Sequence, residues 1–154
     1  KKSLINNSNP FTPSVNLMFA LDEALRMMKD EGLENIFQKH ERHKLAVSEA
    51  AKKLNLKLFA SKESLSPSIT AIEAQNFDAE SFRKSIQDKY DIQLAGGQDH
   101  LKGKIFRVGH LGYINDRDII SVITAIGLTL YEKNIVNEND IGQALIEAKK
   151  HLEK

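Results

Sequence analysis

The first apolar positions of the chain repeat with the period of an α-helix. One face of this helix consists of Leu17, Leu21, Leu25 and Met28. These residues recur three or four positions apart, as the core-facing residues of an amphipathic helix do. Val15, Met18 and Phe19 add apolar surface around the other side. We therefore expect the first half of this helix to be buried on two sides and covered by a second domain or subunit.

Two residues mark where this helix begins. Threonine is a favourable N-cap, and proline fits the first helical position, so Thr12 and Pro13 predict a start at this point. Free N–H groups at such a start favour an anion, although simple capping by Thr12 explains the same residues. Gly32 ends the helix, and a second helix follows. His40 lies on its apolar face, where a core histidine bonded to the backbone is the expected interpretation.

The middle of the chain changes to the alternating pattern of β-strands. The predicted strands cover residues 56–60, 68–74, 91–97 and 102–113. Asp78 caps a helix over residues 78–90, between the second and third strands. Asn115 and Asn137 cap the last two helices, the first of which covers residues 116–133. This order predicts an α+β sandwich with a small, mostly antiparallel sheet covered by helices and preceded by one long helix.

Arg107 interrupts the apolar strand "KGKIFRVGHLGY", residues 102–113. Strand alternation places Phe106, Val108 and His110 on one face, and Ile105, Arg107 and Gly109 on the other. If Phe106 and Val108 face the helices, Arg107 projects from the opposite face, and Gly109 leaves room beside it. A guanidinium is costly to bury without an anion. Arg107 is therefore either a solvated strand residue or the partner of a carboxylate.

The composition removes several classes of function. The 154 residues contain 22 Lys+Arg and 21 Asp+Glu, a net charge of +1, without a basic block that would indicate nucleic-acid binding. The chain has no cysteine, which suits the reducing cytoplasm and leaves no thiolate ligand. The histidines form no metal signature, so no metal site is predicted. No apolar run approaches the roughly 18 to 20 residues of a membrane span. We expect a cytoplasmic protein that binds neither nucleic acid nor membrane.

Two segments, in their order and separation, resemble a known family. They are "NPFTPSVNLMFALDEALRMMKDEGLENIFQKHERH" (9–43) and "LAGGQDHLKGKIFRVGHLGY" (94–113). They resemble the C-terminal small domain of class V, fold-type I aminotransferases that use pyridoxal phosphate. The similarity is to the serine–pyruvate and alanine–glyoxylate branch, which includes proteins labelled soluble hydrogenase small subunits. It covers nearly the whole chain.

The resemblance implies a domain organisation and two site residues. Residues 1–12 would connect a missing large domain to a small domain, residues 13–154, and the intact protein would be a homodimer. Thr12 aligns with the threonine that contacts the cofactor phosphate of the neighbouring subunit. Arg107 aligns with the arginine that binds the substrate carboxylate. Nothing aligns with the Schiff-base lysine, so this chain holds no catalytic residue and is expected to be inactive alone.

The implied reaction moves an amino group from a small amino acid of the alanine or serine type to a 2-oxo acid such as glyoxylate or pyruvate. Two alternatives stay open. One is a free-standing α+β module that binds an amino acid or regulates, without catalysis. The other is a related lyase or desulfurase that uses the same cofactor. Apolar surface at Val15, Met18 and Phe19 speaks against the free module, which would leave it uncovered.

Overall fold

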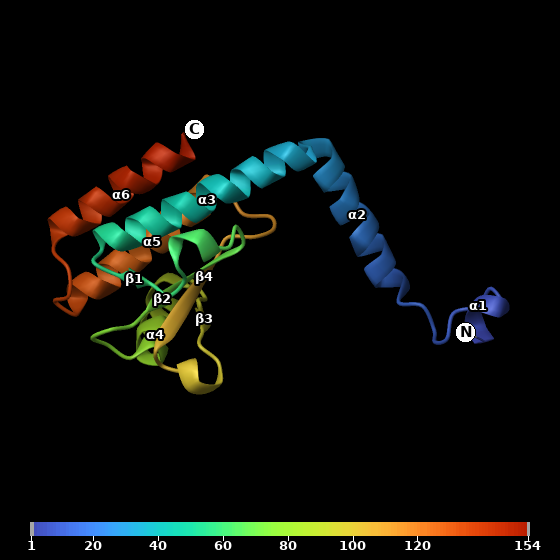
Figure 1. Ribbon diagram of the computed structural model, residues 1–154, viewed down its shortest axis with the longest axis horizontal. Coiled ribbons are helices and arrows are strands. Elements are labelled where there is room, and N and C mark those ends of the chain that lie inside the picture. Colours follow the sequence, from blue (N-terminus) through green and yellow to red (C-terminus); the bar gives the residue numbers. More distant parts are fainter. Residues whose placement is uncertain (1, 154) are drawn as a thin grey trace. The chain divides into compact units, whose positions relative to one another are not determined.

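The computed structural model describes residues 2–153 (Figure 1). Its helices are α1 (Lys2–Ile5), α2 (Val15–Glu31), α3 (Leu33–Lys53), α4 (Ala79–Tyr90), α5 (Asp116–Glu132) and α6 (Glu138–Leu152). Its strands are β1 (Lys57–Leu58), β2 (Ile69–Glu73), β3 (Ala95–Gly96) and β4 (Ile105–Gly109). The predicted order is confirmed from α2 to α6. The fold divides into two compact units, residues 1–37 and residues 38–154.

The start of α2 differs from the prediction. The helix begins at Val15, with Ser14 as its N-cap, so Thr12 is not the cap and Pro13 is not the first helical residue. The Val15 N–H donates to the Pro13 carbonyl at 3.1 Å, and the first helical bond runs from Met18 N to Ser14 O. Proline also disfavours helical geometry in the residue before it, which holds Thr12 outside the helix. The predicted stop is confirmed, since Gly32 ends α2 at a φ of 85°.

The apolar surface of α2 is open to solvent. None of the helix's side chains is buried. Val15, Met18 and Phe19 are 53%, 62% and 71% exposed. Large apolar side chains gathered on one helix in this way are typical of an interaction surface. The covering partner expected from the sequence stays a prediction.

The four strands form one antiparallel sheet in the order β1-β2-β4-β3. They are shorter than the sequence pattern indicates: β4 covers Ile105–Gly109 of the predicted 102–113. Gly103 and Gly112 adopt φ values of 74° and 92° on either side of β4. Such left-handed backbone turns the chain and ends the ladder, which explains the shorter strand.

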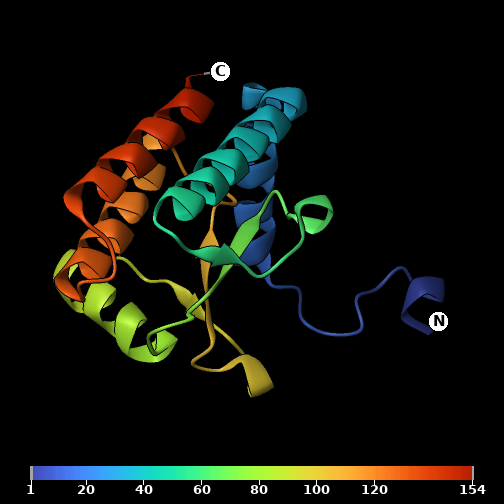
Figure 2. The same cartoon turned by 60° about the vertical axis from the view of Figure 1, so that its left-hand side comes forward.

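Helices α3, α4, α5 and α6 gather on one side of this sheet (Figure 2). Their apolar faces meet the sheet in a single core that includes Val47, Phe82 and Ile119. From the sheet, Ile72 and Phe106 enter the same core. The rings of Phe82 and Phe106 lie 5.1 Å apart, within the range of favourable aromatic contacts. The predicted α+β architecture is confirmed, with one face of the sheet covered by helices.

All three caps expected for α4, α5 and α6 form. The Asp78 carboxylate accepts a hydrogen bond from Ser81 N at 2.7 Å. At α5, Asn115 accepts from Asp118 N while the Asp118 carboxylate accepts from Asn115 N, a reciprocal capping box. Asn137 caps α6 in the same way. Each cap satisfies N–H groups that a helix start leaves without partners.

We predict that Asn115→Ala lowers the free energy of unfolding by about 1 kcal/mol, because the first turn of α5 loses its cap. Asn115→Asp, which keeps an acceptor at the same position, serves as the control and should cost less. Urea denaturation of the two variants and the parent chain measures the difference. Equal losses in both variants would show that the cap contributes nothing.

Candidate functional site

Arg107 lies at the centre of β4, between the neighbouring strands β2 and β3. It pairs with Ala71 on one side and with Ala95 on the other. Phe106 and Val108 are 0% and 1% exposed and belong to the helix-covered core. Alternation therefore directs Arg107 to the opposite face of the sheet, as the sequence predicts.

Arg107 is half-buried, and its guanidinium is only partly bonded. Its Nε donates a hydrogen bond to the Gly96 carbonyl at 2.9 Å. Within residues 2–153, its two terminal nitrogens have no hydrogen-bond partner, and it forms no ion pair with a carboxylate. Because Nε is occupied, the two terminal nitrogens form the edge of the guanidinium that stays available to a planar anion. That edge offers two parallel N–H groups and fits a carboxylate.

On its face of the sheet, Arg107 has small residues across both neighbouring strands and after it along β4, while Ile105 precedes it. Ala71 and Ala95 are its direct cross-strand neighbours. Gly109 lies two residues further along β4, on the same face, and a Cβ added there would meet no atom within 4 Å. The space beside the guanidinium that the sequence predicts is therefore present.

Thr12, the other predicted site residue, belongs to the unit of residues 1–37, whereas Arg107 belongs to the unit of residues 38–154. Thr12 is exposed and lies outside the helix. The side chain of Ser14, the actual N-cap, accepts no hydrogen bond from the first turn of α2, and that turn contains no acidic residue. The start of α2 therefore lacks both a side-chain cap and a negative charge, which suits an incoming anion.

A cluster of buried histidines adjoins the end of β4. The predicted core histidine is confirmed, because His40 is 7% exposed and its Nδ1 donates to the His110 carbonyl at 2.9 Å. The ring of His110 is 0% exposed. Its Nδ1 lies 3.0 Å from the Pro67 carbonyl, and its Nε2 lies 2.9 Å from Thr70 Oγ1. A carbonyl only accepts, so Nδ1 carries the proton and the Thr70 hydroxyl donates to Nε2.

His43 joins the cluster to the start of α5. Its Nε2 lies 2.9 Å from Asp116 Oδ1, and its ring is fully buried. Burial lowers the pKa of His43, and the hydrogen bond to Asp116 opposes that effect. Sequence reasoning missed this network as a whole. Alternation along β4 placed His110 on the core side, and that was the available signal.

The network fixes the segment that follows β4. His110 bonds the segment before β2, and His40 on α3 bonds the His110 backbone. Burial lowers the pKa of His110 from 6.5 to about 4, while the bond to the Pro67 carbonyl opposes the shift only in part. His110 is thus neutral at physiological pH, and the role its contacts support is to hold the chain.

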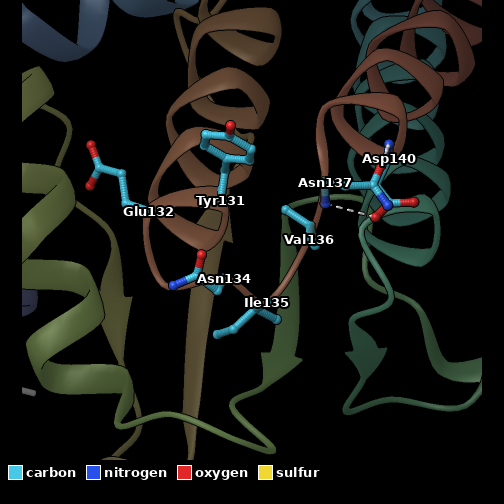
Figure 3. Close-up of a pocket in the computed structure, with 7 residues that line it drawn as sticks. All are labelled: Tyr131, Glu132, Asn134, Ile135, Val136, Asn137 and Asp140. Carbon is cyan, nitrogen blue, oxygen red and sulfur yellow. Dashed lines mark hydrogen bonds between the residues drawn. The ribbon is translucent and has the colours of Figure 1, made fainter.

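Three further features of the described residues bear on function. Among residues 2–153, no group of three or more potential ligand side chains is placed to hold a metal ion. No helix in that part of the chain is long and apolar enough to cross a membrane. An open hollow of about 550 Å³ lies at the connection between α5 and α6 (Figure 3). Its Asn137 and Asp140 form the α6 capping box, and its Glu132 pairs with Lys89, so these groups are already engaged.

Comparison with known proteins finds relatives of this chain, although no family model matches it. Over 139 residues it is 52% identical to the soluble hydrogenase 42 kDa subunit of Anabaena cylindrica, covering 90% of this chain and 36% of that protein. It is 33% identical over 128 residues to the serine–glyoxylate aminotransferase of Methylorubrum extorquens, covering 82% and 32%.

A solved structure gives the same result. The pyridoxamine–pyruvate aminotransferase of Mesorhizobium loti superposes with a TM-score of 0.87 at 26% identity, covering 94% of this chain and 37% of that one. The resemblance to class V, fold-type I pyridoxal-phosphate aminotransferases is therefore confirmed. The chain spans about a third of the length of these relatives, which corresponds to their small C-terminal domain.

The buried histidines predict how stability depends on pH. His110 has a pKa of about 4 when folded and near 6.5 when unfolded, so between these values only the unfolded chain takes up the proton. The contribution of neutral His110 to the free energy of unfolding is fully present above about pH 6.5 and is lost as the pH drops towards 4. The loss from His110 is about 3 kcal/mol, and the lowered pKa of His43 acts in the same direction.

Urea denaturation at a series of pH values measures this loss. His110→Gln keeps one donor and one acceptor but does not titrate, so its stability should vary less between pH 6.5 and 4 than that of the parent chain. Parallel pH profiles for the two proteins would contradict the assignment of the proton to His110.

Proposed function

We propose that residues 13–154 are the small domain of a pyridoxal-phosphate-dependent aminotransferase, and that residues 1–12 connect it to a large domain. The match to relatives over about a third of their own length supports this division. We propose that the intact enzyme is a cytoplasmic homodimer. The open apolar side chains of Val15, Met18 and Phe19 support a covering large domain or partner subunit.

The proposed reaction transfers an amino group from a small amino acid, of the alanine or serine type, to a 2-oxo acid such as glyoxylate or pyruvate. The relative named serine–glyoxylate aminotransferase supports both the amino donor and the acceptor, and the one named pyridoxamine–pyruvate aminotransferase supports the small 2-oxo acid. Each name combines an amino donor with a small 2-oxo acid. Both the amino acid and the 2-oxo acid carry a carboxylate next to the reacting carbon, so one cationic residue serves both.

The placement of Arg107 is the observation that best supports the proposal. Arg107 is a half-buried cation on the face of the sheet opposite the helix-covered core, its Nε is occupied by the Gly96 carbonyl, and Gly109 leaves space on the same face. We assign the substrate carboxylate to its two terminal nitrogens. Two parallel N–H···O bonds would fix the orientation of the carboxylate as well as its position, and thereby the direction of the bonds at the neighbouring carbon.

The residues at the start of α2 suit the cofactor phosphate. Thr12 offers an exposed hydroxyl, and the first turn has neither a side-chain cap nor an acidic residue. We assign Thr12 and the N–H groups of this turn to that phosphate, across the dimer. Pyridoxal phosphate, when bound, supplies an electron sink for the bond changes at the amino acid. The lysine that bonds covalently to it would come from the large domain, so the chain alone is proposed to be inactive.

Two alternatives make different demands on the same residues. A free-standing amino-acid-binding or regulatory module would use Arg107 without catalysis, and it would leave the apolar surface of α2 without a partner. A lyase or desulfurase with the same cofactor would keep both assignments and change the reaction. The names of the relatives favour amino transfer over these alternatives.

We predict that Arg107→Ala in the intact enzyme leaves the fold and the bound cofactor in place and lowers kcat/KM for L-alanine or L-serine. Loss of one side of a buried charge pair costs roughly 2 to 5 kcal/mol, or about 30- to 4,000-fold. Arg107→Lys should recover only part of this loss, because an ammonium does not reproduce the paired contact. Steady-state kinetics of the three proteins measures the effect.

Ethylamine, which is alanine without the carboxylate, is the control substrate. Its poor reaction should hardly change in either variant. If alanine and ethylamine lose the same factor, Arg107 supports the structure and not the substrate, and the assignment is wrong.

We predict that Thr12→Ala weakens cofactor binding, because a hydrogen bond to a charged group contributes about 1.5 to 3 kcal/mol. Ser14→Ala is the matched control: its hydroxyl makes no capping bond to α2, so its loss should leave the affinity within about twofold. Equilibrium titration of the apoenzyme with pyridoxal phosphate gives both affinities. Unchanged affinity in Thr12→Ala would remove Thr12 from the phosphate site.

A further inference from the structure

The carbonyl that holds Arg107 belongs to a weakly supported strand. β3 consists of Ala95 and Gly96 alone, and β4 is its one neighbour in the sheet. So short an edge strand forms few ladder hydrogen bonds. The position of the Gly96 carbonyl, and with it the direction of the Arg107 side chain, therefore depends on other contacts.

Arg83 on α4 supplies such a contact. Its Nε donates to the Leu94 carbonyl, directly before β3, at 2.7 Å, and its Nη1 donates to Glu80 Oε1 at 2.9 Å. Glu80 thus orients the guanidinium that holds the strand. Helix α4, which carries Arg83, is itself firmly anchored, since its Phe82 and Ile86 are both 0% exposed in the core.

The pair of Arg83 and Glu80 also lies directly against Gly96. A Cβ at Gly96 would come within 2.5 Å of Arg83 Nη1 and 2.6 Å of Glu80 Oε1, closer than real contacts allow. A side chain at Gly96 would therefore displace the ends of Arg83 and Glu80 from these positions. Gly96 therefore connects two guanidinium groups: its backbone packs against Arg83, and its carbonyl accepts from Arg107.

We propose that Arg83 is a positioning residue for the carboxylate site: it holds β3 so that the Gly96 carbonyl occupies Arg107 Nε and leaves the two terminal nitrogens for the ligand. This inference rests on the proposed function of Arg107. Arg83 touches no substrate. It holds the Leu94 carbonyl and thereby the neighbouring Gly96, whose carbonyl occupies Arg107 Nε. Arg107 then binds a carboxylate only with its two terminal nitrogens.

A purely local role does not account for these contacts. Within-helix ion pairs three residues apart, such as Arg83 with Glu80, contribute little to stability. The bond from Arg83 to Leu94 is different, because it spans 11 residues and joins a helix to the sheet. Its effect is expected at Arg107, because the Gly96 carbonyl that accepts from Arg107 Nε lies two residues after Leu94.

The test uses the intact holoenzyme and two substitutions, Arg83→Ala and Arg83→Lys. Lys84→Ala is the matched control, because Lys84 is the next residue on α4, is 75% exposed and pairs only with Asp88 among the described contacts. Calorimetry gives the Kd of propionate, an unreactive carboxylate, and kinetics gives kcat/KM for L-alanine and ethylamine. Thermal melts check that each variant folds, and Arg83→Lys keeps the test available if Arg83→Ala does not.

Arg83→Ala should weaken propionate binding and lower kcat/KM for L-alanine by roughly 10- to 100-fold, the range expected when a binding group is misplaced by about 1 Å. Arg83→Lys should lose less, because an ammonium holds Leu94 or Glu80 but lacks the fork that holds both. Ethylamine turnover should stay within about twofold in both variants, as should every measurement on Lys84→Ala.

A double substitution separates positioning from general support. In an Arg107→Ala background, Arg83→Ala should cause no further loss, since its effect passes through Arg107. A full additional loss there, an equal loss for ethylamine, or unchanged propionate binding would overturn the role of Arg83 while leaving that of Arg107 intact. If Arg107→Ala itself fails to distinguish alanine from ethylamine, the assignment of the substrate carboxylate to Arg107 falls as well.

Discussion

The two-residue alternation of β4 is the constraint on which the rest of this structure depends. It sends Phe106 and Val108 into the helix-covered core and Arg107 to the open face. A register slip of one residue would exchange these faces, bury a guanidinium among aromatic rings and expose Phe106. The packing of α4 against Phe106 therefore specifies the register, and the register places the cation. The alternation of β4 thus determines both the packing of the core and the position of the candidate site.

Features that depend on neighbouring residues were predictable from the sequence. The caps Asp78, Asn115 and Asn137 are confirmed because an N-cap acts within one helical turn. The predicted start of α2 was wrong because the residues on either side of Pro13, Thr12 and Ser14, are both good N-caps. Proline is tolerated in the first helical turn as well as before it, so it does not distinguish the two starts. Local preference alone does not decide between those two starts.

Contacts between distant residues were beyond sequence reasoning. The direction of Arg107 followed from alternation, but its bond to Gly96 depends on how the loop between β3 and β4 returns the chain. The histidine network joins His110 to Pro67 and His43 to Asp116, pairs separated by 43 and 73 residues. No spacing rule links such positions. The roles of Thr12 and Arg107 came from resemblance, and they concern groups that this chain does not itself contain.

Gly109 gives the site a property that the core lacks. A side chain added at most core positions would overlap its neighbours, whereas a Cβ at Gly109 meets nothing within 4 Å, although it lies on the same face as Arg107. The wall beside the cation can thus change in size without a change in the packing that supports it. Within this chain, a larger residue at Gly109 would therefore narrow the space on the Arg107 face while the fold stays the same.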